Sequence, residues 1–404
     1  MNGEETSQLK PKLVPCKKWL LFSRKDGNIY CIGNEKTGDF VQVPEDQLEV
    51  IEAVINLFDG KHSLGEIHEH ILQTMDLDVP VDQIFKVFRD ANLIENFPKE
   101  NPDEFQRTST ILLSKDLGQL FEKKLSKKVF YSIFFLSVLL IIVGTGTFIT
   151  KVGYTIFSLE AYYLIGDSTA IGFLISFIII YASSFIHELG HIIVAWYVGV
   201  PPREIRVLLY LGVFPMLFVN IPNIYTASRR HRILIAIAGM YTNIVLASLA
   251  SLLLIAFEQN MIAYQLLVYT ALLNFITPIF ILNPFLPGDG YFLAVNVFKT
   301  PNIRREAFKR LRRIRETKWS KGDIALIAYG TVSILMSAYF FYWFLEWFSL
   351  ALLETVATLS LLSTLADYLL LAIKIAFFSL MIYSTIKTIT LTLNRKRGRS
   401  SSEF

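Results

Sequence analysis

The sequence contains little cysteine, little histidine and few charged side chains for its length. Only two cysteines, Cys16 and Cys31, occur in 404 residues, and both lie in the polar N-terminal third. Two cysteines cannot build a disulfide framework, so we expect reduced thiols in the cytosol. The first 18 residues are polar and lack the apolar core of a secretory signal, so we expect later apolar segments to direct membrane insertion.

Charged residues make up only 18% of the chain, whereas hydrophobic residues make up 53% and the mean hydropathy is +0.44. This balance is too apolar for an ordinary soluble domain and predicts a polytopic α-helical membrane protein. About six apolar segments have roughly the 20 residues that a bilayer core requires. They lie near 129–150, 170–198, 232–257, 262–283, 324–347 and 367–390.

The net charge is only +4, but the basic residues are clustered. Clusters precede the first apolar segment, follow the second, occupy residues 299–321 and end the chain, whereas residues 151–169 contain only Lys151. By the positive-inside rule this alternation places both termini in the cytosol. We interpret the 299–321 cluster as a topology determinant beside anionic lipid, with no nucleic-acid partner. Lys374, inside the last segment, is expected to snorkel to the outer interface.

Residues 1–94 are predicted to form a small α+β domain in the cytosol. Three strand-like runs come first, at residues 19–23, 28–32 and 40–43. Three short helices follow, at about 44–59, from the Ser63–Glu66 capping box to about 73, and at about 81–91. This order of elements is typical of a winged-helix-like module.

The remaining boundaries follow from composition. Residues 95–128 are expected to be a polar linker, 129–392 the transmembrane domain and 393–404 a basic cytosolic tail.

The run His187-Glu188-Leu189-Gly190-His191 lies within the second apolar segment. On a helix the spacing of four places both imidazoles on one face, where they can reach a single metal ion. Glu188 can then act as general base toward a water molecule. The sequence therefore predicts a metal site on a membrane-spanning helix.

Two histidines rarely complete a catalytic zinc site, so a third ligand is needed. The other four histidines lie in the N-terminal domain or at the edge of a span, and we interpret them as surface or local structural residues: His62, His68, His70 and His231. Asp289 is the better candidate, because the second and fourth spans both run outside to inside and bring it to the same leaflet as the histidines. The alternative is a solvated aspartate in a Pro/Gly turn, but such a turn at membrane depth needs protein cover or a cavity.

These residues resemble the site-2 protease family of intramembrane zinc metalloproteases, in particular its bacterial peptide zinc metalloprotease branch. The run from His187 to His191 matches the family's zinc motif, and residues 283–291 are similar to its Asn-Pro…Asp-Gly-Tyr element. Residues 238–243 resemble its Ala-Gly-Pro-x-x-Asn element, with Met240 where proline is usual. Gly288 also departs from the pattern, because an apolar residue usually precedes the aspartate. Neither departure removes a ligand, and the resemblance covers roughly residues 170–300.

The resemblance implies hydrolysis of a peptide bond at Zn²⁺ held by His187, His191 and Asp289, with Glu188 as general base. It also assigns supporting roles to two asparagines: Asn283 would bind the substrate or the oxyanion, and Asn243 would support the site.

Residues 205–224 are apolar but interrupted by Gly212, Pro215 and Pro222. In the family such a stretch forms a membrane-associated β-hairpin whose free edge could pair with an extended substrate. The alternative is a short buried re-entrant segment without substrate contact.

The N-terminal domain is similar, in its order of elements, to PqqD-like domains that bind leader peptides of ribosomally synthesised, modified peptides. A DNA-binding winged helix would have the same strands and helices. However, acidic residues crowd the predicted helices, which argues against contact with phosphates.

Three functions therefore remain open. The first is maturation of a small ribosomal peptide recruited by the N-terminal domain, with a peptide-modifying enzyme or an exporter as a further partner. The second is cleavage of a membrane-anchored regulator. The third is a non-catalytic binding, immunity or export accessory role, which would not require all four of His187, Glu188, His191 and Asp289.

Overall fold

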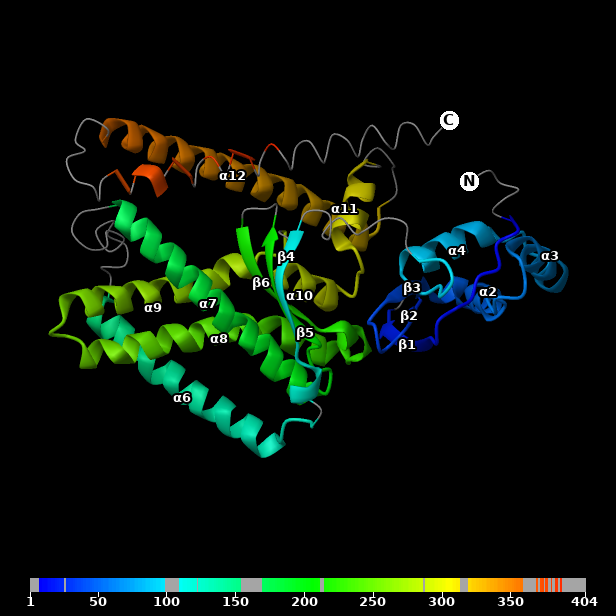
Figure 1. Ribbon diagram of the computed structural model, residues 1–404, viewed down its shortest axis with the longest axis horizontal. Helices are drawn as coiled ribbons and strands as arrows, with labels where there is room; N and C mark the ends of the chain where they lie inside the picture. Colours follow the sequence, from blue (N-terminus) through cyan, green and yellow to red (C-terminus); the bar gives the residue numbers. More distant parts are fainter. Residues whose placement is uncertain are drawn as a thin grey trace.

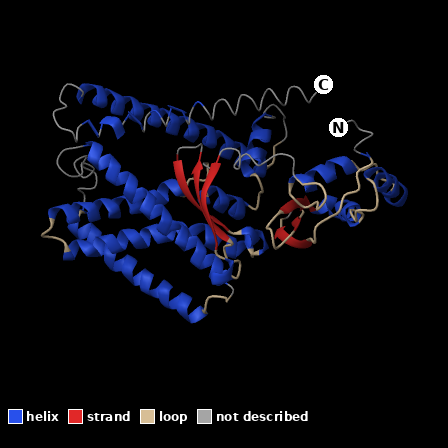
Figure 2. Ribbon diagram, viewed as in Figure 1, coloured by secondary structure: helices blue, strands red, loops and turns tan. Residues whose placement is uncertain are grey.

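The computed structural model consists of an N-terminal domain, a helical bundle and a small sheet that lies over the bundle (Figures 1 and 2). Figure 1 shows the N-terminal domain at one end of the long axis and the bundle at the other. The residues that the structure describes are 7–24, 27–98, 109–121, 123–153, 169–210, 214–285, 288–312 and 319–358, together with fragments of 368–386.

The N-terminal domain contains an antiparallel sheet in the order β1-β2-β3. Its strands are β1 (Lys17–Phe22), β2 (Ile29–Gly33) and β3 (Phe40–Pro44). Three helices follow, α2 (Glu45–Asn56), α3 (Leu64–Met75) and α4 (Val81–Asp90). The predicted strands and helices are all present, although α2 ends earlier than its apolar periodicity suggested. Residues 25 and 26, between the first two strands, lie outside the described residues.

Local chemistry explains the start of α3. The Ser63 hydroxyl accepts a hydrogen bond from the backbone N–H of Glu66, and the Glu66 carboxylate accepts one from the N–H of Ser63. The predicted capping box is therefore confirmed. The core of the domain lies between the sheet and the helices, where Val43, Val54, Ile67 and Phe88 are almost fully buried.

Both cysteines of the N-terminal domain are free thiols. Burial raises the pKa of Cys16 to about 11 and that of Cys31 to about 12. Because the thiolate is the reactive form, both side chains are protonated at neutral pH and act as packing groups.

Four of the described helices are long and apolar enough to cross a membrane. They belong to α6 (Lys127–Lys151), α7 (Thr169–Val198), α8 (Arg229–Ala256) and α9 (Met261–Ile281). Helix α8 is central, because α6, α7 and α9 all pack against it. Helix α6 instead exposes most of its apolar side chains, such as Phe135 and Leu136, as a lipid-facing helix would.

These four helices match the first four predicted segments. The fifth lies in α12 (Lys321–Thr358), whose side chains are described only in part. Most of the sixth, including Lys374, and the whole basic tail lie outside the described residues.

A second antiparallel sheet has the order β4-β5-β6. Strands β5 (Glu204–Tyr210) and β6 (Phe214–Asn220) form the hairpin expected in this stretch. Strand β4 (Ser109–Asp116) pairs with β5 and comes from the segment that composition assigns to a linker. The linker prediction therefore needs correction here, because a strand far away in the sequence provides the hydrogen-bonding partner that makes β4 extended.

Short elements complete the described part of the chain. The 3₁₀ helices η1 (Gly118–Phe121) and η4 (Pro222–Thr226) follow the two outer strands of the second sheet, β4 and β6, at the same end of the sheet. Helices α10 (Asp289–Phe298) and α11 (Ile303–Arg312) lie between the bundle and α12, and α10 packs against α8.

Candidate metal centre

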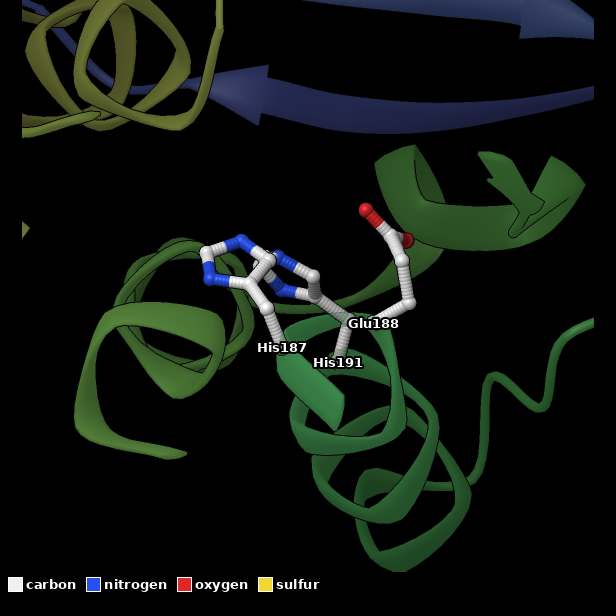
Figure 3. Close-up of side chains that lie close together, drawn as sticks. All are labelled: His187, Glu188 and His191. Atoms are coloured by element: carbon white, nitrogen blue, oxygen red, sulfur yellow. Dashed lines mark hydrogen bonds between the residues drawn. The ribbon is translucent and has the colours of Figure 1, made fainter. Parts of the chain in front are cut away.

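His187 and His191 lie one turn apart on α7, and both side chains are buried. Figure 3 shows their imidazole rings side by side, and their Nε2 atoms are 3.1 Å apart. This is the arrangement that the spacing of four predicts for a helix. Two ring nitrogens therefore approach a common point in a region from which water is largely excluded.

A backbone carbonyl of α8 fixes the tautomer of His191. Its Nδ1 lies 2.7 Å from the carbonyl oxygen of Ile235, which can only accept a hydrogen bond. Nδ1 therefore carries the proton, and in the neutral imidazole Nε2 retains a lone pair. A metal-binding histidine is commonly oriented by such a contact.

Asp289, the first residue of α10, reaches the same point from another element. Its Oδ2 lies 2.9 Å from Nε2 of His187 and 3.1 Å from Nε2 of His191. With Nε2 of His191 unprotonated, hydrogen bonding alone would leave two lone pairs in contact at 3.1 Å. A cation between the three atoms would relieve all three contacts.

The spacing of these donor atoms suits a small cation. Tetrahedral bonds of about 2.0–2.1 Å separate ligand atoms by about 3.3 Å. The observed separations of 2.9–3.1 Å are slightly shorter. The two nitrogens and one oxygen could therefore hold a small metal ion.

Glu188 belongs to the same cluster. One ligand atom from each of His187, Glu188 and His191 lies within 4.8 Å of the others. Figure 3 shows the Glu188 carboxylate beside the two imidazoles. The backbone N–H of Val219 in β6 lies near this carboxylate. Asp289 Oδ2 lies within 3.1 Å of both histidine Nε2 atoms and is therefore the better candidate for a third donor atom.

Two glycines allow α7 and α8 to approach each other at the site. A Cβ on Gly190 would lie 2.2 Å from Oγ1 of Thr242 and 2.6 Å from the carbonyl oxygen of Ala238. A Cβ on Gly239 would lie 2.3 Å from Nε2 of His187 and 2.5 Å from Nε2 of His191. Any side chain at position 239 would therefore occupy the space of the metal-binding atoms.

The Gly239→Ala variant is expected to lose its metal while remaining folded, because the added methyl group displaces both imidazoles. The measurement is the metal content of the purified protein beside its helical content by circular dichroism. Gly146→Ala in α6 is the matched control, since a Cβ there would meet nothing within 4 Å. A Gly239→Ala protein with the metal content of the control would show that this contact does not shape the site.

The loop before Asp289 is held by α11 and α12. The Tyr329 hydroxyl donates to the carbonyl oxygen of Pro284 at 2.5 Å, and the Arg304 guanidinium donates to that of Phe285. Gly290 lies so close to the end of α9 that a Cβ would be 2.5 Å from the carbonyl oxygen of Ile281. The aspartate is therefore presented by a supported loop and not by a solvated turn.

The two asparagines assigned supporting roles do not join the cluster. Asn283 accepts a hydrogen bond from the N–H of Phe285 at 2.9 Å and so shapes the loop locally. Asn243 is buried in α8, and its Oδ1 has no hydrogen-bond partner among the described residues. No hydrogen bond joins either residue to His187, His191 or Asp289 in the described part of the chain.

The other histidines make local contacts or lie exposed. His62 pairs with Asp59 at 3.1 Å, and Nδ1 of His68 lies 3.1 Å from the carbonyl oxygen of Val79. His70 and His231 are exposed. None of the four belongs to the metal-binding cluster found among the described residues.

Sequence reasoning missed several residues that shape the site, namely the Ile235 carbonyl, Arg304 and Tyr329. A backbone carbonyl leaves no signal in the side-chain sequence. Arg304 lies within a basic cluster that topology alone explains, so its role becomes visible only in the structure.

Comparison with known proteins adds no relative. No protein family model matches the chain, and no curated protein or solved structure matches it.

Proposed function

We propose that the protein is an intramembrane zinc endopeptidase. The observation that carries this proposal is the convergence of Nε2 of His187, Nε2 of His191 and Oδ2 of Asp289, with Glu188 beside them. Three protein ligands leave a fourth position open, which is the pattern of catalytic rather than structural zinc sites. When bound, zinc would supply a Lewis acid that polarises the scissile carbonyl and makes a water molecule more acidic.

Glu188 would take a proton from the attacking water and deliver it to the leaving amine. Its position supports this role, because its carboxylate lies beside the two imidazoles (Figure 3), with the Val219 N–H nearby. General acid–base catalysis by one carboxylate requires that it contact both water and substrate, and a substrate bound along β6, which packs against α7, would meet this requirement.

The edge of β6 would bind the substrate. In the second sheet β5 is central, so one edge of β6 has no strand partner among the described residues, and α7 lies against β6. An extended peptide that pairs with β6 by main-chain hydrogen bonds would pass beside Glu188. Strand pairing also unwinds a helical substrate, which peptide-bond hydrolysis requires.

We propose that the substrate is a small ribosomally synthesised peptide recruited by a PqqD-like N-terminal domain. The supporting observation is that this domain packs against α8 and α10, and α10 carries Asp289. Both termini would lie in the cytosol, the four apolar helices would lie in the lipid bilayer, and a peptide-modifying enzyme or an exporter would act on the same peptide. Cleavage of a membrane-anchored regulator would use the same site.

Metal analysis of the purified protein tests the proposed centre. We expect about one zinc ion for each chain, as in other single catalytic sites. His187→Ala and His191→Ala should each lose it, while the exposed His231→Ala, the matched control, should retain it. Iron in place of zinc, or zinc retained in both site variants, would contradict the proposal.

A further inference from the structure

Arg232 of α8 is buried, with only 1% of its surface exposed. Its Nε donates to Oδ1 of Asn296 at 2.7 Å, and its Nη1 donates to the carbonyl oxygen of Ala227 at 2.7 Å. Its Nη2 donates to the carbonyl oxygen of Leu21, in β1 of the N-terminal domain, at 2.8 Å. The guanidinium also lies over the ring of Phe22, 5.2 Å from its centroid.

All hydrogen-bond acceptors of Arg232 among the described residues are neutral carbonyl oxygens. A buried charge without a carboxylate is unfavourable unless its donors are satisfied, so the arrangement depends on every one of these partners staying in place. The Leu21 carbonyl is the only acceptor in this set from the N-terminal domain. Arg232 therefore favours the state in which that domain is docked.

Arg232 also lies close to two groups at the candidate metal centre: the Ile235 carbonyl in α8 and, through Asn296, the helix α10 that begins with Asp289. Arg232 precedes Ile235 by three positions in α8, and the Ile235 carbonyl orients His191. Asn296 lies two turns after Asp289 in α10, and its own side chain donates to the carbonyl oxygen of Phe292 at 2.8 Å. One side chain thus connects the element that orients a histidine with the element that carries the aspartate.

The surrounding interface is apolar and closely packed. Leu21, Phe22, Ile29 and Cys31 form a buried cluster with Tyr225 and Val295 of the membrane domain. Three further contacts join the N-terminal domain to the membrane domain. The ring of Phe40 lies against that of Tyr225, with centroids 4.1 Å apart. Lys299 donates a hydrogen bond to the carbonyl oxygen of Ser23 at 2.8 Å, and Arg203 donates one to the carbonyl oxygen of Lys36 at 3.2 Å.

We propose that Arg232 is a positioning residue that couples docking of the N-terminal domain to the geometry of the metal centre. With the domain docked, the guanidinium holds α8 and α10 in the register that brings Asp289 to the histidines. When the domain moves away, the guanidinium loses the Leu21 carbonyl and both helices lose a shared anchor. The N-terminal domain would then control whether the site can bind its metal, in addition to recruiting a peptide. The link to metal binding rests on the proposed function.

The first test uses the full-length protein loaded with Co²⁺, whose visible spectrum reports ligand geometry. Arg232→Gln is expected to weaken cobalt binding about 10–100-fold and to change the spectrum, as loss of outer-shell support does at metal sites. Arg232→Lys should restore part of the affinity, because it keeps the charge and some donors. Arg230→Gln, an exposed neighbour in α8, is the control and should match the wild type.

The second test disturbs docking from the N-terminal side, away from the metal. Gly38 has φ +78°, and a Cβ there would lie 2.3 Å from Cβ of Pro222 in the membrane domain. Gly60 has a similar φ of +82°, but its nearest neighbour is Lys12 of its own domain at 3.4 Å. Gly38→Ala should therefore loosen docking, whereas Gly60→Ala introduces the same backbone strain without reaching the interface.

Hydrogen exchange and cobalt affinity are measured on both glycine variants. Gly38→Ala, but not Gly60→Ala, is expected to raise exchange at 235–239 and 289–296 and to weaken cobalt binding. Faster exchange at the domain interface without a change in those two segments would overturn the proposed coupling of docking to the metal centre. This result can be read even if Arg232→Gln fails to fold. If His187→Ala leaves cobalt binding unchanged, the proposed metal centre is wrong. The coupling between the N-terminal domain and residues 235–239 and 289–296 is then tested by the hydrogen exchange of Gly38→Ala alone.

Discussion

The Glu188→Gln variant is expected to keep its metal and lose peptide cleavage. The amide has nearly the same shape as the carboxylate but cannot accept a proton from water. General-base catalysis contributes about 10²–10⁴-fold, so the rate should fall by that factor. The metal should stay because Asp289, whose Oδ2 lies 2.9 and 3.1 Å from the two Nε2 atoms, completes the proposed ligand set without Glu188, which lies beside the rings (Figure 3).

Metal content and the rate of cleavage must be measured on the same preparation. Glu258→Gln is the matched control, because this residue makes an exposed ion pair with Lys151 at 3.0 Å, outside the metal-binding cluster. Full cleavage by Glu188→Gln would exclude the general-base role. Loss of metal from that variant would instead make Glu188 a ligand.

The Asp289→Ala variant is expected to lose the metal altogether. Its Oδ2 is the only donor that α10 contributes to the two histidines in the described structure. Changes in the outer shell of metal sites weaken binding about 10–100-fold, and removal of a direct ligand should exceed that range. Asp289→Asn should retain more metal than alanine does, because it keeps an oxygen donor without the charge.

Metal affinity of the Asp289 variants is best measured by competition with a chelator. Asp82→Ala, which removes an exposed carboxylate from α4, is the control for loss of one acidic residue. If Asp289→Ala matches this control in affinity, another group completes the site. Glu188 would then be the first candidate, since it belongs to the same cluster.

The parts of the structure that sequence predicts well are those with local causes. The capping box at Ser63 and Glu66, and the shared helix face of His187 and His191, each depend on residues within one turn. The position of Asp289 was predicted from the direction in which each span crosses the bilayer. This reasoning works at long range because the bilayer fixes the depth of each helix end. The structure places its carboxylate at both histidines, and its role as a ligand stays a prediction.

The parts that sequence does not predict have distant causes. The β4 segment is polar at both ends and becomes a strand only because β5, far along the chain, pairs with it. Arg232 lies in a basic stretch that the positive-inside rule already explains, so nothing in its sequence context indicates burial. Its role depends on Leu21, which is 211 positions away. Such contacts require the folded arrangement of both domains.

The most direct test of intramembrane proteolysis is peptide mass spectrometry on matched cells that express wild-type protein or Glu188→Gln at equal levels. The comparison covers cytosolic, membrane and secreted fractions. We expect a peptide that is shortened only with the wild type, and its sequence would identify the substrate and the cleaved bond. Identical peptides in all fractions of cells that contain the natural substrate would contradict a protease and favour a binding or immunity role.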